Sequence, residues 1–217
     1  MGTRHYLSAL FISCLSSCGS DDETTTYYLN ADTGPGTLRL SNSDGQNSGK
    51  TFSGNQKTQA ELLEKVDETA WKRCREGLEE DPKIVMIRAN QPITDINFEG
   101  ALYLEIHANQ PITHLNLESK DEELVGVPKL CILVRANQPN TKISLDRISV
   151  GQLDYEVHAN QPHLDVDVKE GAGLSSGRIE THTNQSHIEI SGPGALNCEF
   201  ISLHGSGNQN QYQCEKK

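Results

Sequence analysis

The sequence is poor in aromatic residues and in basic charge. Aromatic side chains make up 5% of the 217 residues, with one Trp and four Phe, and the mean hydropathy is −0.57. A large globular core is therefore thinly supplied, whereas a solenoid needs only small aliphatic side chains stacked between short strands. The 30 acidic residues outnumber the 19 basic ones, giving a net charge of −11. This balance disfavours binding to nucleic-acid backbones and docking on anionic lipid.

Motifs that hold phosphates or metals are also missing. The Gly171-Ala172-Gly173 segment is not followed by a helical pattern, so it predicts a turn rather than a phosphate-binding loop. No Cys-x-x-Cys pair occurs, which disfavours a zinc site. We therefore expect no cofactor and no metal centre.

The most specific motif lies at the N-terminus. A short basic start, Met1–His5, precedes a mostly apolar run, Tyr6–Ser13, that is too short to span a bilayer. Leu15-Ser16-Ser17-Cys18 follows, and this segment resembles the signal peptide and lipobox of bacterial lipoproteins. The resemblance covers only the N-terminal segment up to Gly19, and it implies that Cys18 carries lipid, palmitate included, in the cell envelope. Gly19, in place of Asp, favours the outer membrane by the same resemblance, on either of its faces. The rival interpretation is an ordinary secretory peptide with a chance Cys.

The cysteines beyond Cys18 fit an exported protein. An oxidising compartment allows the four of them to form two disulfides. We favour Cys74–Cys131 and Cys198–Cys214 among the three connectivities, because these pairs are neighbours in the repeat order described below. A zinc site formed by all four thiolates is the alternative.

We divide the chain into four parts by composition and pattern. Residues 1–17 are the signal peptide, 18–56 a flexible tether rich in Ser, Thr, Asn, Asp and Gly, 57–81 a helix, and 82–217 a repeat domain. Within the tether, the two short patches Tyr27-Tyr28-Leu29 and Thr37-Leu38-Arg39-Leu40 are candidates to pair as an early strand.

The helix is predicted from a capping box and an apolar stripe. Thr58-x-x-Glu61 has the capping-box pattern, and Leu63, Val66, Ala70 and Cys74 follow at helical spacing. We expect this helix to cap the open end of the repeat domain, where core and strand edges would otherwise be exposed.

The repeat domain is marked by a recurring Asn-Gln dipeptide at spacings of 19 to 28 residues. Four copies read Ala-Asn-Gln-Pro. Such a period predicts an all-β fold, a parallel β-helix (solenoid) of five to six rungs. The pattern resembles parallel β-helix proteins, including pectate-lyase-like folds and bacterial adhesins, in architecture only. The alternative is an antiparallel meander with Asn-Gln-Pro hairpin loops, forming a sandwich or barrel. The repeated asparagines are Asn90, Asn109, Asn137, Asn160, Asn184 and Asn208.

Alignment on these asparagines separates the two faces of each strand. Apolar residues stand five and three positions before Asn, as in Val85 and Ile87, and predict the core side. The positions between them point outward. Because parallel rungs repeat about every 4.8 Å, the asparagine side chains are expected to hydrogen-bond to one another up the stack.

The outward position two residues before each of the first five asparagines is basic, and these residues form a row. Its functional interpretation is a ligand-facing surface for acidic glycans, or one that responds to protonation of its histidines. Its structural interpretation, which we prefer, is a charge-paired face flanked by glutamates. The row contains Arg88, His107, Arg135, His158 and His182.

Two further groups have a weaker basis. His163 and His187 stand at the same distance from their repeated Asn and, with His158 and His182, place four imidazoles in the later rungs. The spacing fixes no third ligand, so no metal site is predicted. Asp165, Asp167 and Glu189 suggest a carboxylate cluster for calcium or acid–base work. They equally form the polar half of an alternating strand, which is our preferred interpretation.

The leading functional hypothesis is a non-enzymatic cell-envelope lipoprotein that presents a solenoid for adhesion or scaffolding. Its partners would be the membrane, through the lipid, and a glycan or envelope protein. The alternative is a polysaccharide-active enzyme, a lyase or hydrolase of the β-helix type.

Overall fold

The structure is a computed structural model, and it describes residues 26–31, 56–57, 59–89, 93–97, 102–108, 112–118 and 125–217. The lipobox with Cys18, most of the predicted tether, and the turn residues Asn90 and Asn109 lie outside the described residues. Neither α-helix in these ranges has the length and apolar character needed to cross a membrane.

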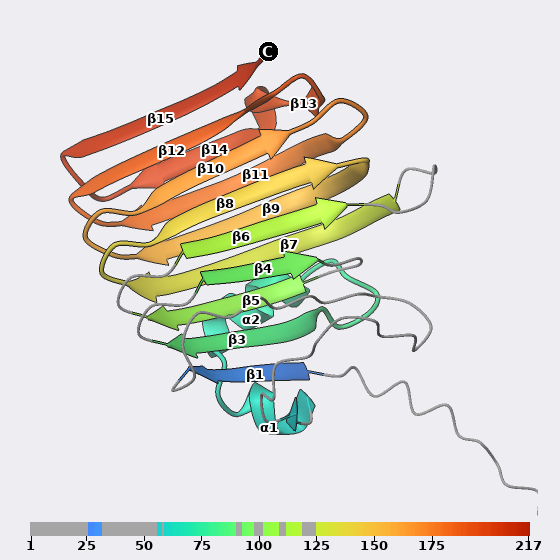
Figure 1. Cartoon of the computed structure of the whole chain (residues 1–217), viewed down its shortest axis with the longest axis vertical. Helices are drawn as coiled ribbons and strands as arrows, with labels where there is room; N and C mark the ends of the chain where they lie inside the picture. The colour runs from blue at the N-terminus through green and yellow to red at the C-terminus, as the bar shows by residue number, and fades with distance from the viewer. Residues whose placement is uncertain are drawn as a thin grey trace, which may run out of the picture.

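The chain forms a parallel β-solenoid, as predicted. The chain alternates between two sheets, so that each rung contributes one strand to sheet A and one strand to sheet B (Figure 1). Sheet A contains β1 (Thr26–Ala31), β2 (Gln56–Lys57), β3 (Lys83–Ala89), β5 (Leu102–Ala108), β7 (Val125–Ala136), β9 (Ile148–His158), β11 (Gly173–His182), β13 (Ala195–Leu196) and β14 (Ile201–Gly205). Sheet B contains β4 (Ile93–Asn97), β6 (Ile112–Glu118), β8 (Asn140–Asp146), β10 (His163–Val168), β12 (Gln185–Gly192) and β15 (Gln209–Lys216).

The pairing decides between the two architectures left open by the sequence. Among the described strands, every ladder is parallel except the short β1–β2 pair, so the antiparallel meander is excluded. Sheet B has six parallel strands, in rough agreement with the five to six rungs predicted.

The core lies between the two sheets and is built from columns of equivalent residues. In sheet A one column of register partners is no more than 2% exposed, and it matches the predicted inward position. Burying each such side chain contributes about 1.5–3 kcal/mol. This column contains Val85, Leu104, Ile132, Tyr155 and Ile179. A facing column in sheet B contains Leu115, Ile143, Val166 and Ile190.

The predicted helix is present, but it is interrupted. Two short helices, α1 (Gln59–Leu63) and α2 (Glu68–Arg75), replace one continuous helix. The break comes at Asp67, whose carboxylate accepts hydrogen bonds from the backbone N–H groups of Thr69 (3.0 Å) and Ala70 (2.9 Å). This N-cap satisfies free donors and begins a second helix. Thr58 of the predicted capping box lies outside the described residues.

The two helices cover more than the end of the solenoid. α1 lies beside β1 at the N-terminal end of the stack (Figure 1), whereas α2 packs on the outer face of sheet A. Trp71 of α2 meets Tyr103 of β5 edge-on, with ring centroids 5.5 Å apart. A second cluster of buried apolar residues lies between the helices and sheet A. It contains Met86 and Leu133, which stand at an outward position of their strands and are covered by the helix. The expected capping role is therefore extended onto this face.

Both predicted disulfides are formed. Cys74–Cys131 ties α2 to β7, and Cys198–Cys214 ties the short 3-10 helix Cys198–Phe200 to β15. The four-thiolate zinc site is thereby excluded, since all four sulfurs are in disulfides.

A strand lies inside the segment predicted to be a tether. β1 pairs in parallel with β3, and Ala31 is in register with Ala89, so Tyr27–Leu29 lies in a strand. Residues 37–40, the patch expected to pair with it, lie outside the described residues. Residues 59–82, which include both helices, are therefore inserted between two neighbouring strands of sheet A.

The two disulfides close loops of different length, which predicts unequal contributions to stability. The pairs are 57 and 16 residues apart. Loop-closure entropy then predicts that C74A/C131A lowers the free energy of unfolding by about 4 kcal/mol and C198A/C214A by about 3 kcal/mol. Urea unfolding followed by circular dichroism measures both, with the single variant C74A separating loss of the bond from loss of packing. A larger loss of unfolding free energy in C198A/C214A than in C74A/C131A would contradict this ranking by loop length.

Candidate functional site

The basic row forms one column on the outer face of sheet A. Strand register pairs Arg88 with His107, His107 with Arg135, Arg135 with His158, and His158 with His182. The structure thus brings together all five predicted residues by backbone position, although the side chain of Arg88 is outside the described part.

Each histidine of the row is paired with the glutamate two residues before it. Within one strand, residues i and i+2 lie on the same face. His158 Nε2 lies 2.8 Å from Glu156 Oε1, His182 Nε2 lies 3.1 Å from Glu180 Oε1, and His107 makes the same contact with Glu105. The flanking glutamates that the sequence places beside the row therefore balance its charge, as the structural interpretation expects.

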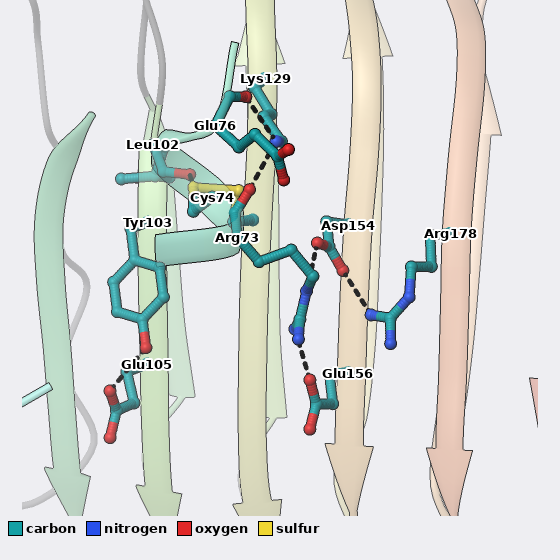
Figure 2. The surroundings of a disulfide bond; sticks show 11 residues. Arg73, Cys74, Glu76, Leu102, Tyr103, Glu105, Lys129, Asp154, Glu156 and Arg178 are labelled. Carbon is teal, nitrogen blue, oxygen red and sulfur yellow. Dashed lines mark hydrogen bonds and ion pairs between the residues drawn. A yellow bond between two sulfur atoms is a disulfide. The ribbon is translucent and has the colours of Figure 1, made fainter. Parts of the chain in front are cut away.

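Arg73 of α2 joins this face to the helix. Its Nε lies 2.7 Å from Asp154 Oδ2, and its Nη2 contacts Glu156 Oε2 (Figure 2). Asp154 is only 3% exposed, and its other oxygen lies 3.1 Å from Nη1 of Arg178. A buried carboxylate between two guanidiniums is well compensated, and loss of either partner would leave part of its charge unpaired.

Lys129 anchors the end of the same helix. Its Nζ donates hydrogen bonds to the carbonyl oxygens of Arg73 (2.7 Å) and Glu76 (3.1 Å), where a cation is favoured by the helix dipole. Burial lowers the pKa of Lys129.

Glu105 is the most buried of the three glutamates that flank the basic row, with 2% of its side chain exposed. Tyr103 Oη donates a hydrogen bond of 2.8 Å to its Oε2, and the backbone N–H of Asp67 donates another of 2.9 Å. Burial works to raise the pKa of Glu105, but the hydrogen bonds from His107, Asp67 and Tyr103 outweigh it and lower the pKa. Burial, and then the charge of Glu105, raises the pKa of Tyr103.

Two pairs of histidines stack in neighbouring rungs. The rings of His158 and His182 have centroids 4.2 Å apart, and those of His163 and His187 on sheet B are 4.8 Å apart. Burial, followed by the charge of the partner imidazole, lowers the pKa of His182 and of His163.

Two of the three carboxylates considered as a cluster on the second strand, Asp165 and Glu189, each form an ion pair. Asp165 lies 3.6 Å from Lys142, and Glu189 lies 3.6 Å from Lys217. Asp165 and Glu189 are register partners, whereas Asp167 faces Ser191. This arrangement agrees with the polar half of an alternating strand.

The amide ladder runs through glutamines instead of the predicted asparagines. Gln138 Nε2 donates to Gln161 Oε1 (3.0 Å), Gln161 to Gln185 (2.7 Å), and Gln185 to Gln209. The described asparagines act through their backbone instead: the carbonyl of Asn137, for example, accepts from the N–H of Asn160 at 2.9 Å. The predicted ladder Asn137, Asn160, Asn184 and Asn208 is therefore displaced by one residue, because the longer glutamine side chain reaches its exposed neighbours. The ladder borders an open groove of about 560 Å³ that is also lined by Asn160, Asn184 and Asn208.

One segment has the spacing of a nucleophile elbow but not its structure. Gly173–Gly177 reads Gly-Leu-Ser-Ser-Gly, yet it lies within strand β11 and no helix follows it. Ser175, which holds the nucleophile position of the motif, is exposed on the strand. The neighbouring Ser176 Oγ donates to the carbonyl of Gly151 at 2.8 Å and joins two rungs.

Several partners on this face are not predicted by the sequence. Asp67 and Arg73 come from the helical insertion, whose docking site depends on tertiary packing. Asp154 could have been found, since it stands two residues before Glu156 and shares its outward face.

Comparison with protein-family models, with curated proteins and with solved structures finds no match to this chain.

The hydrogen bonds of Glu105 predict an acid-sensitive contribution to stability. Because its folded pKa lies below the usual value, its contribution is present above about pH 4.5 and is lost as pH falls through the folded pKa. Glu105→Gln should lower the free energy of unfolding by about 1–3 kcal/mol at pH 7. The difference from the wild type should shrink towards pH 3.

Urea unfolding at pH 7, 5 and 3 tests this expectation. Glu68→Gln is the matched control, since Glu68 pairs with Lys72 on an exposed helix surface and should leave stability unchanged. A deficit of E105Q that stays constant down to pH 3 would contradict the proposed ionic role.

Proposed function

We propose that the protein is a non-enzymatic lipoprotein of the cell envelope, anchored through Cys18, whose solenoid serves adhesion or scaffolding. The observation that carries this proposal is the repetition of equivalent outward side chains along one axis. The glutamine ladder spans four rungs, and the described side chains of the basic row on sheet A also span four. Such surfaces favour an extended partner held by many weak equivalent contacts.

The position of β1 supports a particular orientation on the membrane. Only residues 19–25 separate Cys18 from the first strand, and an extended chain of that length reaches about 25 Å. A lipid at Cys18 would therefore keep β1 and α1 close to the bilayer. The C-terminal rungs lie at the opposite end of the stack (Figure 1) and would point away from it.

The chemistry of the exposed ladders suggests the class of partner. Amide side chains both donate and accept hydrogen bonds, as hydroxyl-rich glycans require, and the groove beside the glutamines is open to solvent. An envelope glycan or a glycosylated surface is thus the ligand that we propose for adhesion.

The lipid anchor can be tested by labelling cells with radioactive palmitate. The wild-type chain should carry label and Cys18→Ser should carry none, because Cys18 is the proposed acylation site. Cys14→Ser is the matched control and should remain labelled, since Cys14 lies within the apolar run. Label that survives in C18S, or an unlabelled wild type, would contradict the anchor.

Protease treatment of intact cells separates the two roles. Adhesion requires that the labelled protein be lost, with a periplasmic protein as the control for membrane integrity. Full protection would exclude adhesion and leave scaffolding on the periplasmic side.

A further inference from the structure

Two histidines of the basic row and one flanking glutamate converge in its C-terminal rungs. The sequence fixes no third ligand beside His158 and His182, but the structure supplies it. We propose that Glu156, His158 and His182 bind one divalent transition-metal ion, of which Zn²⁺ is the representative. Imidazole nitrogens with a carboxylate oxygen are a donor set that Zn²⁺ accepts, with water completing the coordination. The metal site is independent of the proposed envelope function.

The donor atoms are close to the spacing that an ion needs. Glu156 Oε1 lies 2.8 Å from Nε2 of His158 and 3.8 Å from Nε2 of His182. One ligand atom of each residue lies within 4.8 Å of the other two. Donors around tetrahedral zinc, with bonds of 2.0–2.1 Å, are separated by about 3.3 Å, so shifts on the order of an ångström suffice.

The imidazoles must also turn towards a common point. Their rings are nearly parallel, at 10°, whereas a bound ion lies in the plane of each ring. The side chains of His158 and His182 are 40% and 39% exposed. This exposure leaves room for the rotation about Cβ–Cγ.

The fold explains why the site forms in these rungs. Glu156 and His158 are two residues apart on β9 and share the outer face, while His182 is the register partner of His158 on β11. Elsewhere in the described column, His107 is paired in register with Arg88 and Arg135, and a guanidinium does not ligate metals. Among the described strands of sheet A, adjacent histidines of the basic row therefore occur only at His158 and His182.

The surroundings hold the carboxylate in place and suit a cation. Arg73 contacts Oε2 of Glu156 and leaves Oε1 facing the imidazoles. Counting Asp154, Glu156 and Glu180 against Arg73 and Arg178 gives three negative charges and two positive ones. A divalent ion beside neutral imidazoles would thus not enter a net positive site.

The test is a metal titration of the full chain, purified in detergent without a polyhistidine tag and stripped with a chelator. Calorimetry with Zn²⁺ should give one ion per chain. His158→Gln and His182→Gln should each weaken binding by about 100-fold or more, since loss of a ligand should exceed the 10–100-fold effect of losing its supporting contacts. His163→Gln, in the other stacked pair, is the matched control and should bind as the wild type does.

A measurement on the wild type keeps the proposal testable if a variant does not fold, which circular dichroism would show. Electron paramagnetic resonance of the Cu²⁺-loaded wild type should show hyperfine coupling to two imidazole nitrogens. The proposal is overturned by absent binding, by unchanged affinity in H158Q/H182Q, by equal loss in H163Q, or by a Cu²⁺ spectrum without nitrogen coupling.

Discussion

Parallel stacking in register is the constraint from which most of this structure follows. Each strand hydrogen-bonds to the equivalent strand of the next rung, at a spacing of about 4.8 Å. A one-residue slip would turn the core side of a strand to solvent, so the register is fixed by burial. Every position in the repeat therefore becomes a column, and each side chain must be compatible with its neighbours above and below. The apolar columns, the glutamine ladder and the charged row are three consequences of this one constraint.

The sequence was sufficient to predict the fold because the repeat contains both the turn and the alternation. The Ala-Asn-Gln-Pro copies set the period, and Leu104, Ile132 and Tyr155 occupy one predicted inward position that is buried in the structure. The register of the basic row followed from the same alignment. What alignment could not decide was which side chain of the turn bonds along the stack. That depends on reach and direction, and Gln161 has one more methylene than Asn160.

The helical insertion was harder to place because its packing partners are distant in the sequence. An apolar stripe indicated one helix, but α1 ends at Leu63 and Asp67 caps a second helix, α2. A clue to its docking site was present in Met86 and Leu133, which stand at an outward position where β5, β9 and β11 have glutamates. Two apolar residues on an otherwise polar face indicate that something covers it. Arg73 then binds Asp154 and Glu156, more than 80 residues away, an interaction that no local pattern encodes.

The insertion makes the two ends of the charged column chemically different. Beneath α2, Glu105 is held by Tyr103 and by the backbone of Asp67, so its hydrogen bonds serve to attach the helix. Beyond α2, His158 and His182 are about two-fifths exposed and stack on one another, which charged imidazoles would oppose. At the glutamate position of the repeat, the exposure of the side chain rises from 2% at Glu105 to 15% at Glu156 and 26% at Glu180, so the later rungs are the more accessible ones. Since a lipid at Cys18 would hold the early rungs against the membrane, the accessible rungs are those that would face a partner.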